Sequence, residues 1–486
     1  MGIPDDDPST SADGPSHSEL VEEVLSLRRL VAEVVETNEK LRSEVTELRA
    51  RLSLNSRNSS KPPSSDGYEK PAPKSRRVRS GKKPGKQPGD PGKHLAKRTD
   101  PDAVATHAPK SCSGCGGDLS DAPVTSVATR QVFDLPPVAL LCTEHRSETK
   151  RCSCGASTSG AFPAGATAPA CYGPALRAQV CYLVTRQHLP IARVAELLAD
   201  TYGAPVSTGT IVAMVKEGAG MLQGFLAQVK DLLSVSKVIH GDETGLRVKA
   251  LLAWVHAVSS TELTLYHLDD KRGNGAMDAM GILPTFQGIV VHDGWKAYAK
   301  YEKATHALCN AHHLRELTAI AEQEGQHWAE DMADLLTDTW AQVLVAKEKG
   351  RAALTKKQLQ AFDDRYFEII DAGHLANPPP ISTRRRPKQS KARNLLIRLD
   401  RRPEDVQRFA WDFSVPFDNN LSERDIRMIK ITQKISGGFR TTEGAEAFLA
   451  FRSYLSTVGK QGVNRLGALQ QLFLGDPWMP SVPTPG

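Results

Sequence analysis

The sequence predicts a multidomain α/β protein with an N-terminal coiled coil, a small cysteine-rich module, a helical region and an α/β core interrupted by a helical insertion. Three observations support this class: a heptad repeat near the N-terminus, two closely spaced cysteine pairs, and a change from helix-like to strand-like hydrophobic spacing after Lys237. A chain of 486 residues is long enough for roughly two to four domains. We place the segments at 18–54, 55–100, 101–160, 161–235, 236–460 and 461–486.

Composition and charge exclude several classes of protein. No apolar run approaches the roughly 18 residues that a membrane span needs, and the acidic N-terminus lacks the basic-then-apolar layout of a signal peptide. Eight cysteines in a chain of this length do not indicate a disulfide scaffold. The formal net charge of +6 is mild, and its clustering carries more information than its size. We expect a cytoplasmic protein.

The N-terminal segment 18–54 carries a heptad repeat typical of a coiled coil. Two sets of residues recur every seven positions: Leu20, Leu27, Val34, Leu41 and Leu48, and Val24, Val31, Asn38, Val45 and Leu52. β-branched residues at one position and leucine at the other favour a parallel two-stranded coil, in which paired Asn38 side chains would fix the register. The alternative is a single amphipathic helix packed on its own protein. The regularity favours a homodimer or a larger assembly.

Residues 55–100 form a basic segment without apolar periodicity. Between Lys70 and Arg98 there are eleven Lys or Arg residues and one acid, Asp90. Such a segment cannot bury a core and is expected to be a disordered linker. Near DNA it would neutralise phosphates and release counterions. A plain solvated linker is the alternative.

Residues 101–160 are predicted to form a small zinc module. Cys112-Ser-Gly-Cys115-Gly-Gly has the pattern of a zinc knuckle, and Cys152-Ser-Cys154-Gly supplies two more thiolates for a tetrahedral structural site. The one-residue spacer of the second pair is shorter than the common two. A domain with few large apolar residues needs such a metal to fold. Three nearby residues remain alternative ligands: His107, Cys142 and His145.

Residues 161–235 are predicted to be helical and to resemble a helix-turn-helix. An amphipathic helix from about Leu189 is followed by a turn at 202–207, and Ser207 or Thr208 is placed to cap a second helix. This outline suits a DNA reader. Two ordinary packed helices are the alternative, because the second helix carries few side chains that read bases.

From residue 236 to 460 the pattern indicates an α/β core. Strands are expected at 238–244, 251–258, 262–268, 288–292 and 305–309, with helices at 274–283 and from about 311. This order matches a ribonuclease-H-like core. Asp242 and Asp293 would then meet at neighbouring strand ends, where two carboxylates share a cation such as Mg²⁺. Glu243 and Asp270 compete with them as nearby acids.

A third acid comes from a helix that begins near Asp418–Asn420, residues that are suited to capping. The helical wheel predicts one core-facing stripe and one charged face. The predicted stripe contains Leu421, Met428, Ile431 and Ile435, and the charged face contains Glu423, Arg427, Lys430 and Lys434. Such a face suits a metal ligand beside phosphate contacts. A solvated Glu–Arg pair is the alternative reading.

The 130 residues between Asp293 and Glu423 exceed what a minimal core needs and predict a helical insertion at about 325–400. Residues 328–376 are predicted to form two long helices. A second basic tract at 383–393 contains Arg384, Arg385 and Arg386, which we expect to contact DNA. We expect the same of Arg440, further along the chain.

Several blocks together resemble the transposases of insertion sequence sixty-six. They are Asn58-Ser-Ser-Lys-Pro-Pro-Ser-Ser-Asp66 after the heptads, the two cysteine pairs, Asp242-Glu-Thr, His292-Asp-Gly-Trp-Lys-Ala-Tyr298, Cys309-Asn-Ala-His-His-Leu-Arg315, Asp418-Asn-Asn-Leu-Ser-Glu-Arg424 and Gly437-Gly-Phe-Arg440. The blocks cover nearly the whole chain in the family's order.

The resemblance implies a ribonuclease-H-like catalytic domain in which Asp242, Asp293 and Glu423 bind Mg²⁺. Two ions would serve phosphoryl transfer, with Mn²⁺ as an alternative metal and Zn²⁺ as a structural ion. It further implies action at the inverted-repeat ends of a mobile element, so that the partners are end and target DNA, accessory proteins of the same element and no membrane. A protein of this kind would associate with the nucleoid.

Three other functions fit parts of the sequence. A non-catalytic, dimeric DNA-binding regulator accounts for the first 235 residues but not for the acids on strands. A nuclease that hydrolyses without joining differs only in strand transfer. A decayed transposase has no support, because all three acids are present.

Overall fold

The computed structural model describes residues 16–55, 58–59, 89, 95–136, 138–379 and 389–481. Most of the predicted basic linker, including 60–88, and the predicted DNA contacts Arg384, Arg385 and Arg386 lie outside the described residues. The chain divides into two compact units, each of which joins segments that are distant in sequence. The first contains 1–74 and 289–420, and the second contains 75–288 and 421–486.

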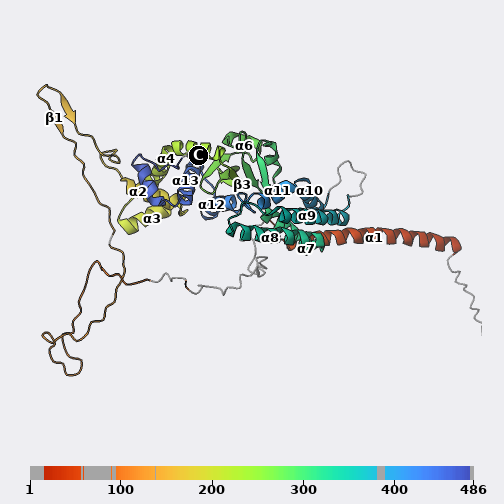
Figure 1. Cartoon of the computed structure of the whole chain (residues 1–486), viewed down its shortest axis with the longest axis horizontal. Helices are drawn as coiled ribbons and strands as arrows, with labels where there is room; N and C mark the ends of the chain where they lie inside the picture. The colour runs from red at the N-terminus through yellow and green to blue at the C-terminus, as the bar shows by residue number, and fades with distance from the viewer. Residues whose placement is uncertain are drawn as a thin grey trace, which may run out of the picture. The chain divides into compact units, whose positions relative to one another are not determined.

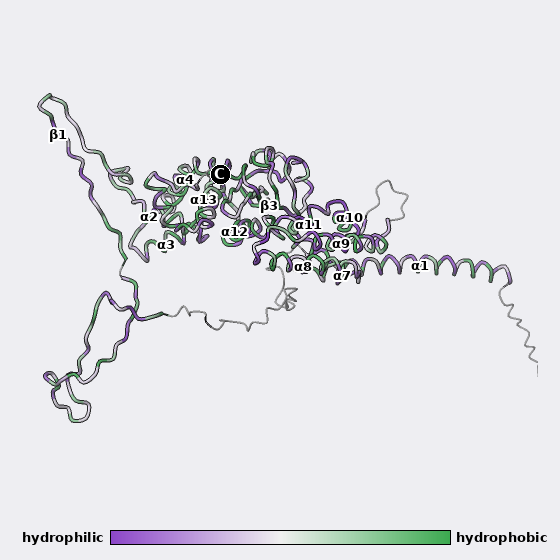
Figure 2. Tube along the Cα trace, viewed as in Figure 1, coloured by the Kyte–Doolittle hydropathy of each residue, from purple (hydrophilic) through white to green (hydrophobic). Residues whose placement is uncertain are grey.

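The first unit begins with α1 (His17–Leu52), a single helix of 36 residues. Ser16 and Glu19 form a capping box that satisfies amide groups of the first turn. Apolar residues recur along this helix among polar ones (Figure 2), and the described side chains from Ser16 to Leu52 are exposed, including Leu27 at 53% and Leu48 at 56%. The alternative to a coiled coil required the heptad face to pack on the same chain, and the described heptad residues do not do so.

The rest of the first unit is a parallel strand pair and a helical layer. Strand β6 (Ile289–His292) pairs with β7 (Thr305–Leu308), and the 3₁₀ helix η2 (Lys296–Lys300) connects them. The helices are α7 (Asn310–Glu324), α8 (His327–Glu348), α9 (Lys356–Ala376), α10 (Lys391–Arg401) and α11 (Pro403–Trp411). Trp328, Tyr366 and Phe409 belong to their shared hydrophobic core. The two long helices predicted between 328 and 376 are confirmed as α8 and α9.

The second unit contains a three-stranded antiparallel sheet in the order β5-β4-β3. The strands are β3 (Val238–Val248), β4 (Leu251–Ser259) and β5 (Thr264–Asp269), followed by α6 (Asn274–Met280). Helices α12 (Asn420–Ser436) and α13 (Thr442–Lys460) share a core with this sheet, in which Leu246, Ile429 and Phe448 are buried. The chain then forms α14 (Arg465–Phe473).

In the described part of the second unit, four helices precede the sheet: α2 (Pro174–Thr185), α3 (Ile191–Tyr202), α4 (Thr208–Met221) and α5 (Gln223–Ser234). Figure 1 labels the first three of them. The predicted turn is confirmed. Gly203 ends α3 in the left-handed region with φ 59°, and the Ser207 side chain caps α4 by accepting a hydrogen bond from the Thr210 amide. Helices α2, α3 and α4 share a small core around Val194, Leu198 and Ile211.

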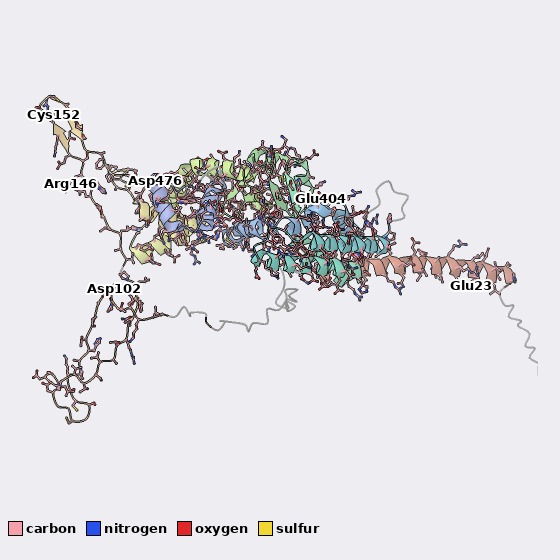
Figure 3. All side chains as sticks on the ribbon, in the orientation of Figure 1. Glu23, Asp102, Arg146, Cys152, Glu404 and Asp476 are labelled. Atoms are coloured by element: carbon pink, nitrogen blue, oxygen red, sulfur yellow. The ribbon has the colours of Figure 1, made fainter. Side chains whose placement is uncertain are left out.

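The cysteine-rich segment lies in the second unit and contains only the short hairpin of β1 (Thr149–Arg151) and β2 (Ser157–Ser159). Cys152 lies at the tip of this hairpin (Figure 3). Nearly all residues of this segment are exposed, so it has no hydrophobic core of its own among the described residues. None of the described helices is both long and apolar enough to cross a membrane.

Candidate active site

Asp242 lies in the first half of β3, opposite Ala257 of β4. Side chains alternate between the two faces of a strand, so Asp242 points to the same face as Leu246 and Val248. Both of these residues belong to the core that the sheet shares with α12 and α13. Asp242 therefore faces the helix that carries Glu423.

Glu243 points to the opposite face and has a different environment. Its side chain is only 2% exposed and forms an ion pair with Arg272, whose Nε and Nη2 both donate to Oε1. The Arg272 guanidinium also lies 5.1 Å from the centre of the Trp254 ring. A buried carboxylate that is held in this way has a structural role. The other competitor, Asp270, is exposed just beyond the end of β5.

Helix α12 carries Glu423 in its first turn. The carboxylate of Asp418 accepts hydrogen bonds from the Asn420 amide at 3.0 Å and from the Asn420 side chain at 2.6 Å, which orders the start of the helix. Glu423 is half-buried. The backbone amides at the start of a helix favour a negative charge at this position.

The core-facing stripe predicted for α12 was wrong. The buried residues of this helix are Ser422, Ile426, Ile429 and Thr432, whereas Ile435 is 50% exposed and Leu421, Met428 and Ile431 are only half-buried. Polar side chains occupy two of these core positions, Ser422 and Thr432. Thr432 is compatible with burial because it shares a hydrogen bond of 2.6 Å with the buried His188. Counting apolar residues alone therefore selected the wrong face.

The register of α12 against the sheet is fixed by three contacts. Near its N-terminus, Asp425 accepts a hydrogen bond from Ser259, the residue opposite His240 in β3. Further along, the Lys430 ammonium donates to the Gly245 carbonyl at 2.6 Å. After the helix ends, Phe439 pairs with Val248. The helix thus runs along β3 in the strand direction, and its first turn lies at the end of β3 that carries Asp242.

The Gly437-Gly438-Phe439-Arg440 block makes the last of these contacts. Gly437 has φ 73°, which an L-side chain rarely adopts and which ends the helix. A Cβ at Gly438 would lie 2.6 Å from the Arg247 carbonyl oxygen, so only glycine allows the approach. The amide of Phe439 then donates to that carbonyl, and its own carbonyl accepts from the Lys249 amide, both at 2.8 Å.

Asp425 holds α12 in place through a polar cage that the sequence did not indicate. Its carboxylate accepts hydrogen bonds from Ser259 at 2.8 Å, Thr264 at 3.1 Å, Ser456 at 3.0 Å and Lys460 at 2.9 Å. Burial acts to raise the pKa of Asp425, but the Lys460 ammonium and the hydroxyl donors outweigh it and hold the pKa below its usual range. These partners come from β4, β5 and α13 and are 31 to 166 residues away in sequence, so no local pattern could have revealed them.

Asp293 is the first residue after β6, in the first unit. Strands β6 and β7 are parallel, and His292 lies opposite Leu308, so Asp293 and Cys309 follow the same ends of two adjacent strands. The Asp293 Oδ1 accepts a hydrogen bond from the Trp295 amide at 2.8 Å, and Oδ2 receives none within the described part of the chain. A carboxylate at the carboxyl end of a buried strand, with one oxygen fixed and the other available, is suited to bind a cation.

The segment that leads into α12 is attached next to Asp293. The amide of Asn419 donates to the Cys309 Sγ at 3.1 Å, and the amide of Asn310 donates to the Phe417 carbonyl at 3.1 Å. Asn310 is itself buried and donates to the Val406 carbonyl. Glu423 follows Asn420 by only three residues in the chain. These bonds hold the Phe417–Asn419 segment next to the end of β7, all within the first unit.

The predicted DNA contacts on and after α12 differ in exposure. Arg427, Lys434 and Arg440 are exposed. Lys430 binds the Gly245 carbonyl, and desolvation lowers its pKa, so its ammonium is already engaged with the sheet. On α4, the second helix of the predicted helix-turn-helix, Lys216 is exposed, as is Val212 at 49%.

Both cysteine pairs lie in turns that are closed by equivalent backbone hydrogen bonds, the second turn being one residue shorter. In the first, the Cys112 amide donates to the Gly117 carbonyl, and the Gly116 amide donates to the Cys112 carbonyl at 2.9 Å. In the second, the Cys152 amide donates to the Ala156 carbonyl, and the Gly155 amide donates to the Cys152 carbonyl at 2.9 Å. The glycine after the second cysteine has a positive φ in each pair, 78° and 90°. The one-residue spacer therefore still closes a knuckle.

The turns also prepare the thiols for a metal. Amides of the Cys115 and Gly114 backbone lower the pKa of Cys112, and the Cys154 amide and side chain lower the pKa of Cys152. Thiolates are the form that binds zinc. The sulfur atoms of the two pairs do not form a group within 4.8 Å in the described structure. The donor chemistry fits Zn²⁺, and each half of the site is preformed.

The comparisons with known proteins place the chain in a family. The model of the family described as "Transposase IS66 family" matches residues 169–447, more than half of the chain. The chain belongs to this family. The zinc-finger binding domain of transposase IS66 matches residues 109–155, which include all four predicted zinc ligands. A family of unknown function matches residues 11–96.

Two curated relatives of this IS66-family chain come from Sinorhizobium fredii. The uncharacterized protein y4jD is 23% identical over 417 residues, which are 76% of this chain and 75% of that protein. The uncharacterized protein y4qI is 26% identical over 263 residues, which are 48% of this chain and 46% of that protein. The family supports a transposase role and DNA binding, and its zinc-finger domain indicates a structural zinc.

Proposed function

We propose that this IS66-family protein is a DDE transposase that cleaves DNA at the inverted-repeat ends of its own insertion sequence and joins those ends to target DNA. Residues 236–460 would form a ribonuclease-H-like catalytic core. Asp242, Asp293 and Glu423 would together hold two Mg²⁺ ions, with Mn²⁺ as an alternative. Three carboxylates form the oxygen donor set that these cations prefer. The observation that carries the proposal is the placement of α12, whose first turn lies at the end and on the face of β3 that carry Asp242.

The position of Asp293 gives independent support. Its Oδ2 accepts no hydrogen bond from the described residues, and in the same unit the Asn419 amide donates to Cys309, the residue after β7. Bound Mg²⁺ would supply a nucleophilic water for cleavage and stabilise charge on the leaving oxygen. The protein's own contribution is to fix the carboxylate oxygens before the DNA binds. The sheet and α12 would position Asp242 and Glu423, and the Trp295 amide would position Asp293 through its Oδ1.

We also propose which residues contact the DNA. Arg427, Lys434 and Arg440 are exposed on or after α12 and would neutralise phosphates, as would Lys430 if DNA displaced its contact to Gly245. Helices α3 and α4 would read the element ends as a helix-turn-helix. The basic tract with Arg384, Arg385 and Arg386 would add contacts to the backbone of the DNA.

Two further parts complete the proposed assembly. A zinc ion would be held by Cys112, Cys115, Cys152 and Cys154 and would join the two knuckle turns into one module. The exposed heptad face of α1 would pair with a second copy of the chain, so that the working complex is a dimer or larger. We also propose that accessory proteins of the same element take part and that the protein associates with the nucleoid, as expected of a transposase of this family.

The test uses a DNA duplex that contains one element end, incubated with the full chain and Mg²⁺. Asp242→Asn and Glu423→Gln should reduce both cleavage and strand transfer by about 1000-fold or more, because each removes a ligand worth several kcal/mol of charge stabilisation. Binding of the duplex, measured by gel shift, should persist.

Asp270→Asn is the matched control, since Asp270 is an exposed acid close in sequence that the proposal does not use. It should cleave like the wild-type protein. Normal strand transfer by Asp242→Asn or Glu423→Gln would refute the catalytic assignment. Binding without any metal-dependent cleavage by the wild-type protein would identify a regulator, and cleavage without joining would identify a nuclease.

A further inference from the structure

The residue before Asp293 is a histidine that the proposed chemistry does not use. His292 is the last residue of β6 and is completely buried. Its ring stacks on Tyr298 of η2, with the ring centres 4.3 Å apart and the planes at 15°. A polar ring in such a position requires hydrogen bonds for its nitrogens, and both of them have one.

The hydrogen bonds of His292 form a chain with only one possible direction. The Gly294 amide donates to Nδ1 at 3.0 Å, and Nε2 lies 3.1 Å from the Nδ1 of His306. The Nε2 of His306 lies 3.2 Å from the Tyr301 carbonyl oxygen. An amide can only donate and a carbonyl can only accept, so both rings must be neutral and carry their proton on Nε2. The chain runs from Gly294 through His292 and His306 to Tyr301.

This chain holds the backbone on which Asp293 depends. Gly294 has φ 89°, a conformation that favours glycine, and its amide is fixed by the His292 ring. The next amide, that of Trp295, is the donor that fixes the Asp293 Oδ1. Both amides after Asp293 are thus used, one by the ring before it and one by its own carboxylate. The direction of the free Oδ2 follows from these two bonds.

We propose that His292 is a positioning residue for Asp293, acting through the Gly294 amide, and that His306 keeps His292 in the required tautomer. This inference rests on the proposed function of Asp293 as a metal ligand. Groups that orient a metal ligand without touching the metal commonly change metal affinity by about 10- to 100-fold when removed. The pair should therefore act on metal binding more than on the stability of the fold.

The experiment measures Mn²⁺ binding to the full, zinc-loaded chain from the electron paramagnetic resonance signal of the free ion. His292→Leu should weaken binding by about tenfold or more, because no acceptor remains for Gly294. His292→Asn should restore most of the affinity, since its Oδ1 can accept from the same amide. His374→Leu is the matched control, a partly exposed histidine of α9 in the same unit that pairs with Asp400. Its affinity should be unchanged.

Wild-type affinity in His292→Leu would overturn the inference, and so would equal losses in His292→Leu and His292→Asn, which would indicate lost packing instead. Asp293→Asn distinguishes a failure of this positioning role from a failure of the proposed function. If it loses Mn²⁺ while His292→Leu does not, only the positioning role fails, and if neither loses Mn²⁺, the metal role of Asp293 fails too. Nitrogen-15 spectra of histidine-labelled protein give a readout that needs no folded Leu variant. The signals of the His292 ring are those that disappear from the spectrum of His292→Asn. A proton on Nδ1 of His292 would also overturn the inference.

Discussion

Replacing Asp425 with alanine should destabilise the second unit more than any other change of a single charged residue on α12. Asp425 and Lys460 have side chains that are 13% and 16% exposed, and their ion pair is 2.9 Å long. Removing the carboxylate leaves the ammonium buried without its counter-ion and leaves three hydroxyl donors to find new acceptors. Breaking a buried pair in this way costs about 3–5 kcal/mol. We therefore expect Asp425→Ala to lower the free energy of unfolding by about that amount.

Urea denaturation followed by circular dichroism measures this change, and a double-mutant cycle isolates the pair. Lys460→Met in the Asp425→Ala background should cost less than Lys460→Met alone, because no uncompensated charge remains. Glu368→Ala is the matched control, since Glu368 pairs with Arg365 at 3.0 Å but both side chains are more than half exposed. It should cost below about 1 kcal/mol. An Asp425→Ala cost no larger than that of Glu368→Ala would refute the reasoning, because the cage would then contribute nothing beyond a surface pair.

Three further predictions concern the pH dependence, the zinc module and the N-terminal helix. Burial, followed by repulsion from Arg452 and Arg186, lowers the pKa of His188 to about 4, below its value of about 6.5 in an unfolded chain. The unfolded state therefore takes up a proton first as pH falls, so the free energy of unfolding should drop from about pH 6.5 towards pH 4. The loss should reach about 2 kcal/mol at pH 5, and His188→Asn should flatten this part of the stability–pH curve. Cys112→Ser or Cys152→Ser should reduce the zinc content measured by atomic absorption, whereas Cys171→Ser, an exposed cysteine outside the two turns, should leave it unchanged. Replacing Leu27 and Leu41 of α1 with lysine should convert the proposed dimer to a monomer in analytical ultracentrifugation. Lysine at Ser26, which is also exposed but lies outside the two repeating positions, should not, and a monomeric wild-type chain would contradict the coiled coil.

The sequence predicted the elements of this protein better than the faces those elements bury. Strand and helix positions depend on local spacing, so the turn at Gly203, the cap at Ser207 and the strand before Asp293 were found correctly. The buried face of α12 depends on partners elsewhere in the chain. His188 satisfies Thr432 from 244 residues away, which makes a polar residue compatible with the core. Hydrophobic periodicity has no means of detecting such a partner.

The cysteine module illustrates a different limit. The pattern indicated a knuckle for the first pair and raised doubt about the second because of its short spacer. The two turns close with equivalent hydrogen bonds and a positive-φ glycine at the same place after the second cysteine, so the spacer length matters less than that glycine. That glycine was visible in the sequence as Gly155. The local pattern predicted a zinc ion, but it does not determine how the two turns lie relative to one another, and we propose that the bound ion joins them.

The neighbouring acids Asp242 and Glu243 carry the strongest argument for a catalytic role. They differ by one residue, and on a strand that difference reverses the face to which a side chain points. Glu243 meets Arg272, which neutralises it within the fold, so its charge is used for structure. Asp242 instead faces the side of the sheet covered by α12, where the ordered first turn brings Glu423 to the same end of the strand. Neighbouring carboxylates repel one another and are costly to bury, and a divalent cation offsets both costs. We therefore propose that the divalent cation on which the proposed chemistry depends completes this arrangement.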